Sequence, residues 1–226
     1  VRFSLIRMGS ARMVDGYLRQ SPLAHLHLDA RAANDINVTD AGLMLGERRH
    51  VGMINLRGEP ADPAFAAAVK KAVGVALPDG INRSSGKPLS IHILALGPDE
   101  WLIVCPPGTE DSIFGKMTKA MKPLHAAVTM SSEARTVIQL AGTDARNGLA
   151  KGCPLDLHPR AFGPGQCAQS ILGRADILIH QTGSNAGSSD ASYDLFVLRS
   201  FAEYVWTWLE DAGREYGVKV FSPAEK

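Results

Sequence analysis

The sequence has few cysteines, no long apolar run and almost no net charge. Its 226 residues include only Cys105, Cys153 and Cys167, a sparse and odd set that favours free thiols in a reducing compartment over disulfides. No apolar run approaches the ~20 residues needed to cross a bilayer. Lys and Arg number 24 against 23 Asp and Glu, so the basic excess of nucleic-acid-binding proteins is missing. We therefore expect a cytoplasmic protein that binds neither nucleic acid nor a membrane.

Two common cofactor motifs are also absent. No G-x-G-x-x-G follows a predicted strand, and no G-x-x-x-x-G-K occurs. We therefore expect no site for FAD, NAD or a nucleotide of the kinds that these motifs build.

Residues 1–20 contain four arginines and a single acidic residue, Asp15. Organelle transit peptides can have this composition, although the apolar core of a secretion signal is missing. We expect a tail that is either disordered or docked on a partner. The alternation of histidine and leucine in Ser21–Leu28 then predicts an edge strand, in which His25 and His27 alone do not make a metal site.

The amino-acid composition is that of a globular protein. The pattern of residues 51–132 predicts the element order β-α-β-β-α-β. Asp62 is suited to cap a helix that begins at Pro63, and Thr109 is suited to cap a second helix. This order is typical of the split βαβ, or ferredoxin-like, arrangement. The predicted strands are Val51–Leu56, Ile91–Leu96, Trp101–Cys105 and His125–Ser131.

Residues 133–226 repeat that order loosely, with a short helix from Thr143 that Gly152 ends. We therefore expect an α+β fold of two intertwined ferredoxin-like units, residues 51–132 and 133–226. An N-terminal arm and extended segment, residues 1–50, precedes them. The predicted strands of the second unit are Arg135–Ala141, Cys167–Leu172, Ala175–Gln181 and Tyr193–Leu198.

The last helix is the clearest of the predicted elements. Ser200 and Glu203 have the spacing of a capping box. Trp206 lies off the predicted apolar face, and an exposed tryptophan is typical of a protein interface. We therefore interpret Trp206 as a contact for a partner. The predicted apolar face consists of Phe201, Tyr204, Val205, Trp208, Leu209 and Ala212.

Reactive side chains are densest between Lys151 and Cys167. Cys153, His158 and Cys167 could be metal ligands, or Cys153 could be a nucleophile with His158 as its base. The C-x4-H-x8-C spacing offers only three ligands and no C-x-x-C pair, whereas structural zinc takes four. A buried free cysteine is the commoner outcome.

Two prolines, Pro154 and Pro159, fix the shape of this loop. We interpret it as a docking feature, and we predict no catalytic, cofactor-binding or metal-binding residue on this chain. Together with Trp206, the candidate contacts for a partner are Cys153, Asp156, His158 and Arg160.

Several segments between about Ser21 and Gly217 resemble one known family. The most specific are Gly97–Trp101, Lys151–Phe162 and Arg199–Trp208. The segments are SPLAHLHL, GMINLRGEPADPAFAAAVKKAVGVALP, LGPDEWLIVCPPG, RTVIQLAGTDARNGLAKGCPLDLHPRAFGPGQCAQSILGRADILIH and DLFVLRSFAEYVWTWLEDAGREYG. They closely resemble the gamma subunit of heterotetrameric sarcosine oxidase.

The resemblance implies a complex with alpha, beta and delta subunits that oxidatively demethylates sarcosine to glycine. Such a complex reduces oxygen to hydrogen peroxide and, with tetrahydrofolate, yields 5,10-methylenetetrahydrofolate. The resemblance implies that FAD, FMN, NAD, folate and zinc belong to the other subunits, and that this chain is a noncatalytic assembly subunit. It also implies a fold similar to the glycine-cleavage T-protein and to folate-binding domains.

One alternative is a stand-alone folate-binding aminomethyltransferase or iron–sulfur-maintenance protein of the same fold. Lys151-Gly152-Cys153 resembles the start of a motif in the maintenance proteins, but the residues that follow differ from it. A metal-dependent enzyme built on histidine and cysteine is a third possibility. Fold likeness by itself does not confer a folate site.

Overall fold

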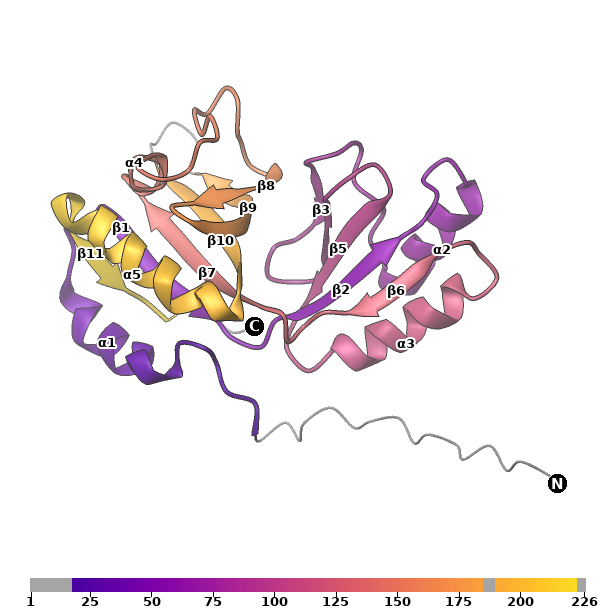
Figure 1. The fold of residues 1–226 in the computed structure, drawn as a ribbon, viewed down its shortest axis with the longest axis horizontal. Helices are drawn as coiled ribbons and strands as arrows, with labels where there is room; N and C mark the ends of the chain where they lie inside the picture. The colour runs from indigo at the N-terminus through magenta and orange to yellow at the C-terminus, as the bar shows by residue number, and fades with distance from the viewer. Residues whose placement is uncertain (1–17, 185–189, 223–226) are drawn as a thin grey trace.

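The computed structural model describes residues 18–184 and 190–222, which form two β-sheets with helices on their outer sides (Figure 1). Most of the predicted N-terminal tail lies outside the described residues. The strands are β1 (Leu43–Arg48), β2 (Gly52–Arg57), β3 (Ser84–Gly86), β4 (His92–Ala95), β5 (Glu100–Cys105), β6 (Ala127–Met130), β7 (Arg135–Gly142), β8 (Cys167–Leu172), β9 (Ala175–Ser184), β10 (Ala191–Leu198) and β11 (Val218–Val220). The helices are α1 (Leu28–Asn34), α2 (Pro63–Val73), α3 (Glu110–Met121), α4 (Ala145–Ala150) and α5 (Ala202–Gly213).

The first unit is ferredoxin-like, as the sequence predicts. Its sheet has the order β3-β4-β5-β2-β6, in which the chain order β2-α2-β4-β5-α3-β6 gives the antiparallel pairing of a split βαβ unit. Helix α2 begins at Pro63, and the Asp62 carboxylate accepts a hydrogen bond from the Ala64 backbone N–H at 2.9 Å. This confirms the predicted cap.

The second sheet has the order β11-β1-β7-β10-β9-β8. Strand β1 precedes the first unit in the chain, yet it pairs antiparallel with β7 and parallel with β11. The first described strand, β1, therefore belongs to the second sheet, and the chain then builds the whole first unit before it returns to the second sheet. This connection makes the two ferredoxin-like units intertwined, which confirms the predicted fold class.

Three layers of apolar side chains hold the fold together. One lies between the second sheet and helices α1, α4 and α5, and another lies between the first sheet and helices α2 and α3. The third joins the two sheets face to face. Its buried members are Val51, Met53, Leu94, Leu102, Val104, Val137, Cys167, Leu178 and Phe196.

Residues 21–28 do not form the predicted edge strand. They form a 3₁₀ turn, Ala24–Leu26, which leads into α1. The Ser21 hydroxyl accepts a hydrogen bond from the Leu23 backbone N–H at 2.9 Å and donates to Glu47. Leu23 and Leu28, on either side of the turn, are buried in the core and hold the turn against it. Local hydrogen bonding by serine therefore overrides the alternating pattern.

Two predicted helix caps are also wrong. The Thr109 hydroxyl donates to the Pro106 carbonyl at 2.7 Å instead of accepting from the helix. At the last helix, a 3₁₀ turn (Arg199–Phe201) takes up the position of the expected capping box. Helix α5 therefore begins at Ala202, and no side chain caps it.

None of the described helices is long and apolar enough to span a bilayer.

Candidate functional site

The loop that follows α4 presents polar side chains on an apolar anchor. Cys153, Leu157 and Phe162 are buried in the core beneath the second sheet. Asp156, His158 and Arg160, by contrast, are exposed, as the docking interpretation requires. The set of candidate contacts is thus divided, because Cys153 is turned inward and its thiol lies 3.7 Å from the Ser170 hydroxyl oxygen.

Backbone hydrogen bonds fix the shape of this loop. One Asp156 carboxylate oxygen accepts from the His158 backbone N–H at 2.9 Å, and His158 Nδ1 accepts from the Arg160 backbone N–H at 3.2 Å. The His158 carbonyl also accepts from Ala161 and Phe162. The loop backbone and the Asp156 and His158 side chains are therefore held in place without a partner, which lowers the entropy lost on docking.

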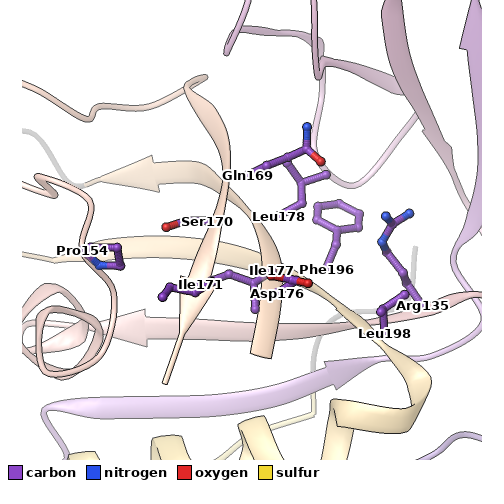
Figure 2. A pocket seen from close by; sticks show the side chains of 10 residues that line it. All are labelled: Arg135, Pro154, Gln169, Ser170, Ile171, Asp176, Ile177, Leu178, Phe196 and Leu198. Carbon is purple, nitrogen blue, oxygen red and sulfur yellow. The ribbon is translucent and has the colours of Figure 1, made fainter. Parts of the chain in front are cut away.

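A hollow of about 600 Å³ adjoins the loop at Pro154 (Figure 2). Figure 2 shows Pro154 and Arg135 on opposite sides of it, with residues of β8, β9 and β10 between them. Strand β8 is the edge of the second sheet, and its Ile171 side chain is 44% exposed. The lining residues are Arg135, Pro154, Gln169, Ser170, Ile171, Asp176, Ile177, Leu178, Phe196 and Leu198.

Trp206 is not exposed, so the expectation of a partner contact through its side chain is wrong. It is fully buried, whereas Phe201 is 40% and Tyr204 39% exposed. The helix begins one residue later than the pattern predicts, and the buried face is rotated by about one residue. That face consists of Ala202, Val205, Trp206, Leu209, Ala212 and Gly213.

The cysteines predicted as possible metal ligands lie apart. Cys153 packs in the core beneath the second sheet, whereas Cys167 packs between the two sheets. Burial raises the pKa of the Cys167 thiol to about 12, and burial also raises the pKa of the Cys105 thiol. Neither thiol has the lowered pKa of a catalytic cysteine.

Cys167 should resist alkylation in the folded chain. A pKa of about 12 reduces its thiolate population at pH 8 on the order of a thousandfold relative to a free thiol. We expect mass spectrometry to find Cys167 unmodified after iodoacetamide treatment that consumes added glutathione. In guanidinium all three cysteines should react, and rapid modification of Cys167 in the native chain would contradict its burial.

A buried polar cluster lies between the two sheets. Arg48 forms an ion pair with Asp194, and the Arg48 guanidinium also donates to the Pro88 carbonyl at 3.1 Å. The His92 and His180 rings are stacked, with their centroids 5.5 Å apart. Ligand atoms of His92, His180 and Asp194 all lie within 4.8 Å of one another, which makes them the candidates for holding a metal in the described residues.

Sequence reasoning missed this cluster because its members come from separate strands. The available signal was a polar residue flanked by apolar residues of a strand, as at His180 after Ile177–Ile179 in β9 and Asp194 before Leu195–Leu198 in β10. Burial dominates their electrostatics. It lowers the pKa of His92 to about 3 and that of His180 to about 4, and it raises the pKa of Asp194 against the opposing effect of Arg48.

Comparison with known structures supports the T-protein-like fold. A chain of the heterotetrameric sarcosine oxidase from Corynebacterium sp. U-96, in complex with pyrrole 2-carboxylate, superposes with a TM-score of 0.77 at 31% identity, covering 88% of this chain and 96% of that one. The glycine cleavage system aminomethyltransferase T from Bartonella henselae superposes with a TM-score of 0.65 at 17% identity. The match covers 90% of this chain and 59% of that one. At that identity, the second likeness shows the fold alone.

Comparison of sequences identifies the family. The model of the sarcosine oxidase, gamma subunit family matches residues 57–215. The gamma subunit of sarcosine oxidase from Corynebacterium sp. (strain P-1) is 32% identical over 199 residues, which are 88% of this chain and 92% of the relative. The gamma subunit from Corynebacterium sp. (strain U-96) is 32% identical over 212 residues, 92% and 97% of the two chains. The chain therefore belongs to the sarcosine oxidase gamma subunit family.

Proposed function

We propose that this chain is a noncatalytic assembly subunit of a cytoplasmic heterotetrameric sarcosine oxidase. The observation that carries the proposal is family membership together with likeness to a chain of a solved heterotetramer over 88% of this chain. Its partners would be the alpha, beta and delta subunits, with neither nucleic acid nor a membrane involved.

The complex would convert sarcosine, oxygen and tetrahydrofolate to glycine, hydrogen peroxide and 5,10-methylenetetrahydrofolate. The other subunits would hold FAD, FMN, NAD, tetrahydrofolate and zinc. Two of the three thiols on this chain have pKa values raised by burial, which is the opposite of what nucleophilic catalysis requires. This supports a structural role for the chain.

The loop of Asp156, His158 and Arg160, with the adjoining hollow, is the surface that we propose for docking a flavin-bearing subunit. The loop is pre-organised by its own hydrogen bonds. Exposed Ile171 supplies apolar surface beside it, and Arg135 and Asp176 supply charges of both signs in the hollow. Apolar surface with a polar rim is typical of protein interfaces.

Co-expression of the alpha, beta and delta subunits with and without this chain tests the assembly role. We expect that omission of the chain lowers the recovery and flavin content of the complex, and with them sarcosine-dependent peroxide production. The purified chain alone should not oxidise sarcosine. A fully active, flavin-loaded complex that forms without the chain would overturn the proposal.

Reversal of charge at Arg160 should weaken docking without affecting the fold. Arg160→Glu places a carboxylate at the exposed loop, and we expect at least about a tenfold loss of affinity for the partner subunits, with slower association at low salt. Lys70→Glu, at an exposed position on α2, is the matched control and should assemble normally. Equal assembly of both variants, measured by co-purification, would show that the loop is not part of the interface.

Folate binding is the alternative that the T-protein-like fold raises. The fold likeness at 17% identity does not supply a site. Calorimetric titration of the isolated chain with tetrahydrofolate distinguishes the two functions. We expect no saturable heat, and saturable micromolar binding would favour the folate-binding alternative.

A further inference from the structure

Three ligand-type side chains from both units meet between the sheets. His92 is the first residue of β4, whereas His180 and Asp194 lie opposite each other on β9 and β10. Their side chains are almost fully buried, since His92 and His180 are 1% exposed and Asp194 is 0% exposed. One ligand atom from each lies within 4.8 Å of the other two.

The hydrogen bond of His92 fixes which ring nitrogen is free. His92 Nδ1 lies 3.2 Å from the Ser90 carbonyl oxygen. A carbonyl oxygen only accepts, so Nδ1 carries the proton and Nε2 presents a lone pair. In the described part of the chain, His92 Nε2 has no hydrogen-bond partner.

A similar argument fixes the tautomer of His180. Its Nε2 lies 3.0 Å from the Ser84 hydroxyl oxygen, and that hydroxyl donates its proton to the Gly165 carbonyl at 2.9 Å. The Ser84 oxygen therefore accepts from His180, so Nε2 carries the proton and Nδ1 presents the lone pair. Metal-binding histidines almost always donate their second ring N–H outward in this way.

Asp194 adds a third acceptor. One of its oxygens pairs with Arg48, and the Gln139 side chain also hydrogen-bonds to the carboxylate. Oδ1, like Nδ1 of His180, has no close hydrogen-bond partner among the described residues. Each of the three neighbouring side chains thus has one buried acceptor atom without a close hydrogen-bond partner in the described residues. A single water has only two hydrogens to donate, whereas one cation can bind all three acceptors.

The size of the gap suits a single bound atom. Three atoms within 4.8 Å of one another surround a point at most about 2.8 Å from each. The side chains must close by less than an ångström to reach the ~2.1 Å of a metal–nitrogen bond.

We propose that His92, His180 and Asp194 form a binding site for one divalent first-row transition metal ion that cross-links the two sheets. Two imidazole nitrogens and a carboxylate oxygen suit Zn²⁺, Co²⁺, Fe²⁺ or Ni²⁺. This proposal does not rest on the assembly role, and it departs from the sequence-based prediction of no metal on this chain. Arg48 already neutralises Asp194, so we expect micromolar rather than nanomolar affinity.

The hollow in Figure 2 borders the same face of the second sheet as the site. Leu178 and Phe196 line the hollow. They lie two residues along β9 and β10 from His180 and Asp194, and alternate residues of a strand share a face. The buried Leu178 and Phe196 side chains therefore lie between the hollow and the two ligands on that face.

Titration of the full chain with metal tests the proposal. After chelation and dialysis, Co²⁺ is added while visible absorption is recorded, and Zn²⁺ binding is measured by calorimetry. We expect one equivalent of either ion to bind and the melting temperature to rise. His92→Gln and His180→Gln should bind at least about tenfold more weakly. His158→Gln, in the exposed loop, should bind like the unmodified chain.

Nitrogen NMR of the unmodified chain provides a measurement that does not depend on folded variants. Before metal is added, the ¹⁵N shifts should show His92 protonated on Nδ1 and His180 on Nε2. Zn²⁺ should then shift His92 Nε2 and His180 Nδ1. No saturable binding, equal binding by all three variants, or shifts confined to exposed histidines such as His25 and His158 would overturn the proposal.

Discussion

Replacement of Arg48 with methionine should lower the free energy of unfolding by about 3–5 kcal/mol. The Arg48 side chain is only 10% exposed and Asp194 is fully buried, so the substitution leaves a carboxylate without its counter-charge between the two sheets. Urea unfolding in the presence of a chelator measures the loss. The chelator keeps any bound metal from contributing to stability.

The loss should depend on pH in a defined direction. Burial already raises the pKa of Asp194, and removal of Arg48 raises it further. A group with a raised folded-state pKa contributes stability below its unfolded pKa and loses it as pH rises through the folded value. The Arg48→Met defect should therefore be smaller at pH 5 than at pH 8.

Two variants distinguish the loss of the buried ion pair from the loss of an arginine side chain in general. Arg48→Met combined with Asp194→Leu should recover most of the stability, because it removes both charges. Arg57→Met breaks the more exposed pair with Glu100, whose side chains are 51% and 23% exposed, and should cost less than about 1 kcal/mol. If Arg48→Met and Arg57→Met cost the same, the buried pair does not have the strength that we assign to it.

Replacement of Trp206 with alanine should also lower the free energy of unfolding by about 3–5 kcal/mol, because it leaves a cavity in the core. The side chain is fully buried beneath the second sheet, among residues such as Val205 and Leu209. Thermal unfolding followed by circular dichroism should show a drop in melting temperature on the order of 10 °C. This loss would occur in the isolated chain, without any partner.

Phe201→Ala is the matched control for an aromatic residue near the start of the same helix. Phe201 is 40% exposed, so its loss should cost about 1 kcal/mol or less. Trp206→Phe should recover most of the stability, because the indole Nε1 has no hydrogen-bond partner in the described part of the chain and the substitution keeps much of the buried apolar area. If Phe201→Ala were the more damaging change, the face predicted from sequence would be the buried one.

The sequence by itself determined the first unit and the fold class. Asp62 and Pro63 begin α2 through interactions within a few residues, and the apolar runs of β4 and β5 flank a hairpin turn at Gly97–Glu100. These signals are local, so neighbouring residues suffice to specify them. The family resemblance likewise rested on segments that can be compared residue by residue.

Only the tertiary structure decided the insertion of β1, the orientation of α5 and the polar cluster. Strand β1 pairs with β7 and β11, which follow it by roughly 90 and 175 residues, and no local pattern encodes such a pairing. Trp206 lies on the buried face of α5, which begins at Ala202 after a 3₁₀ turn that the local pattern did not predict. His92, His180 and Asp194 meet only because the two sheets pack face to face, since each residue comes from a separate strand.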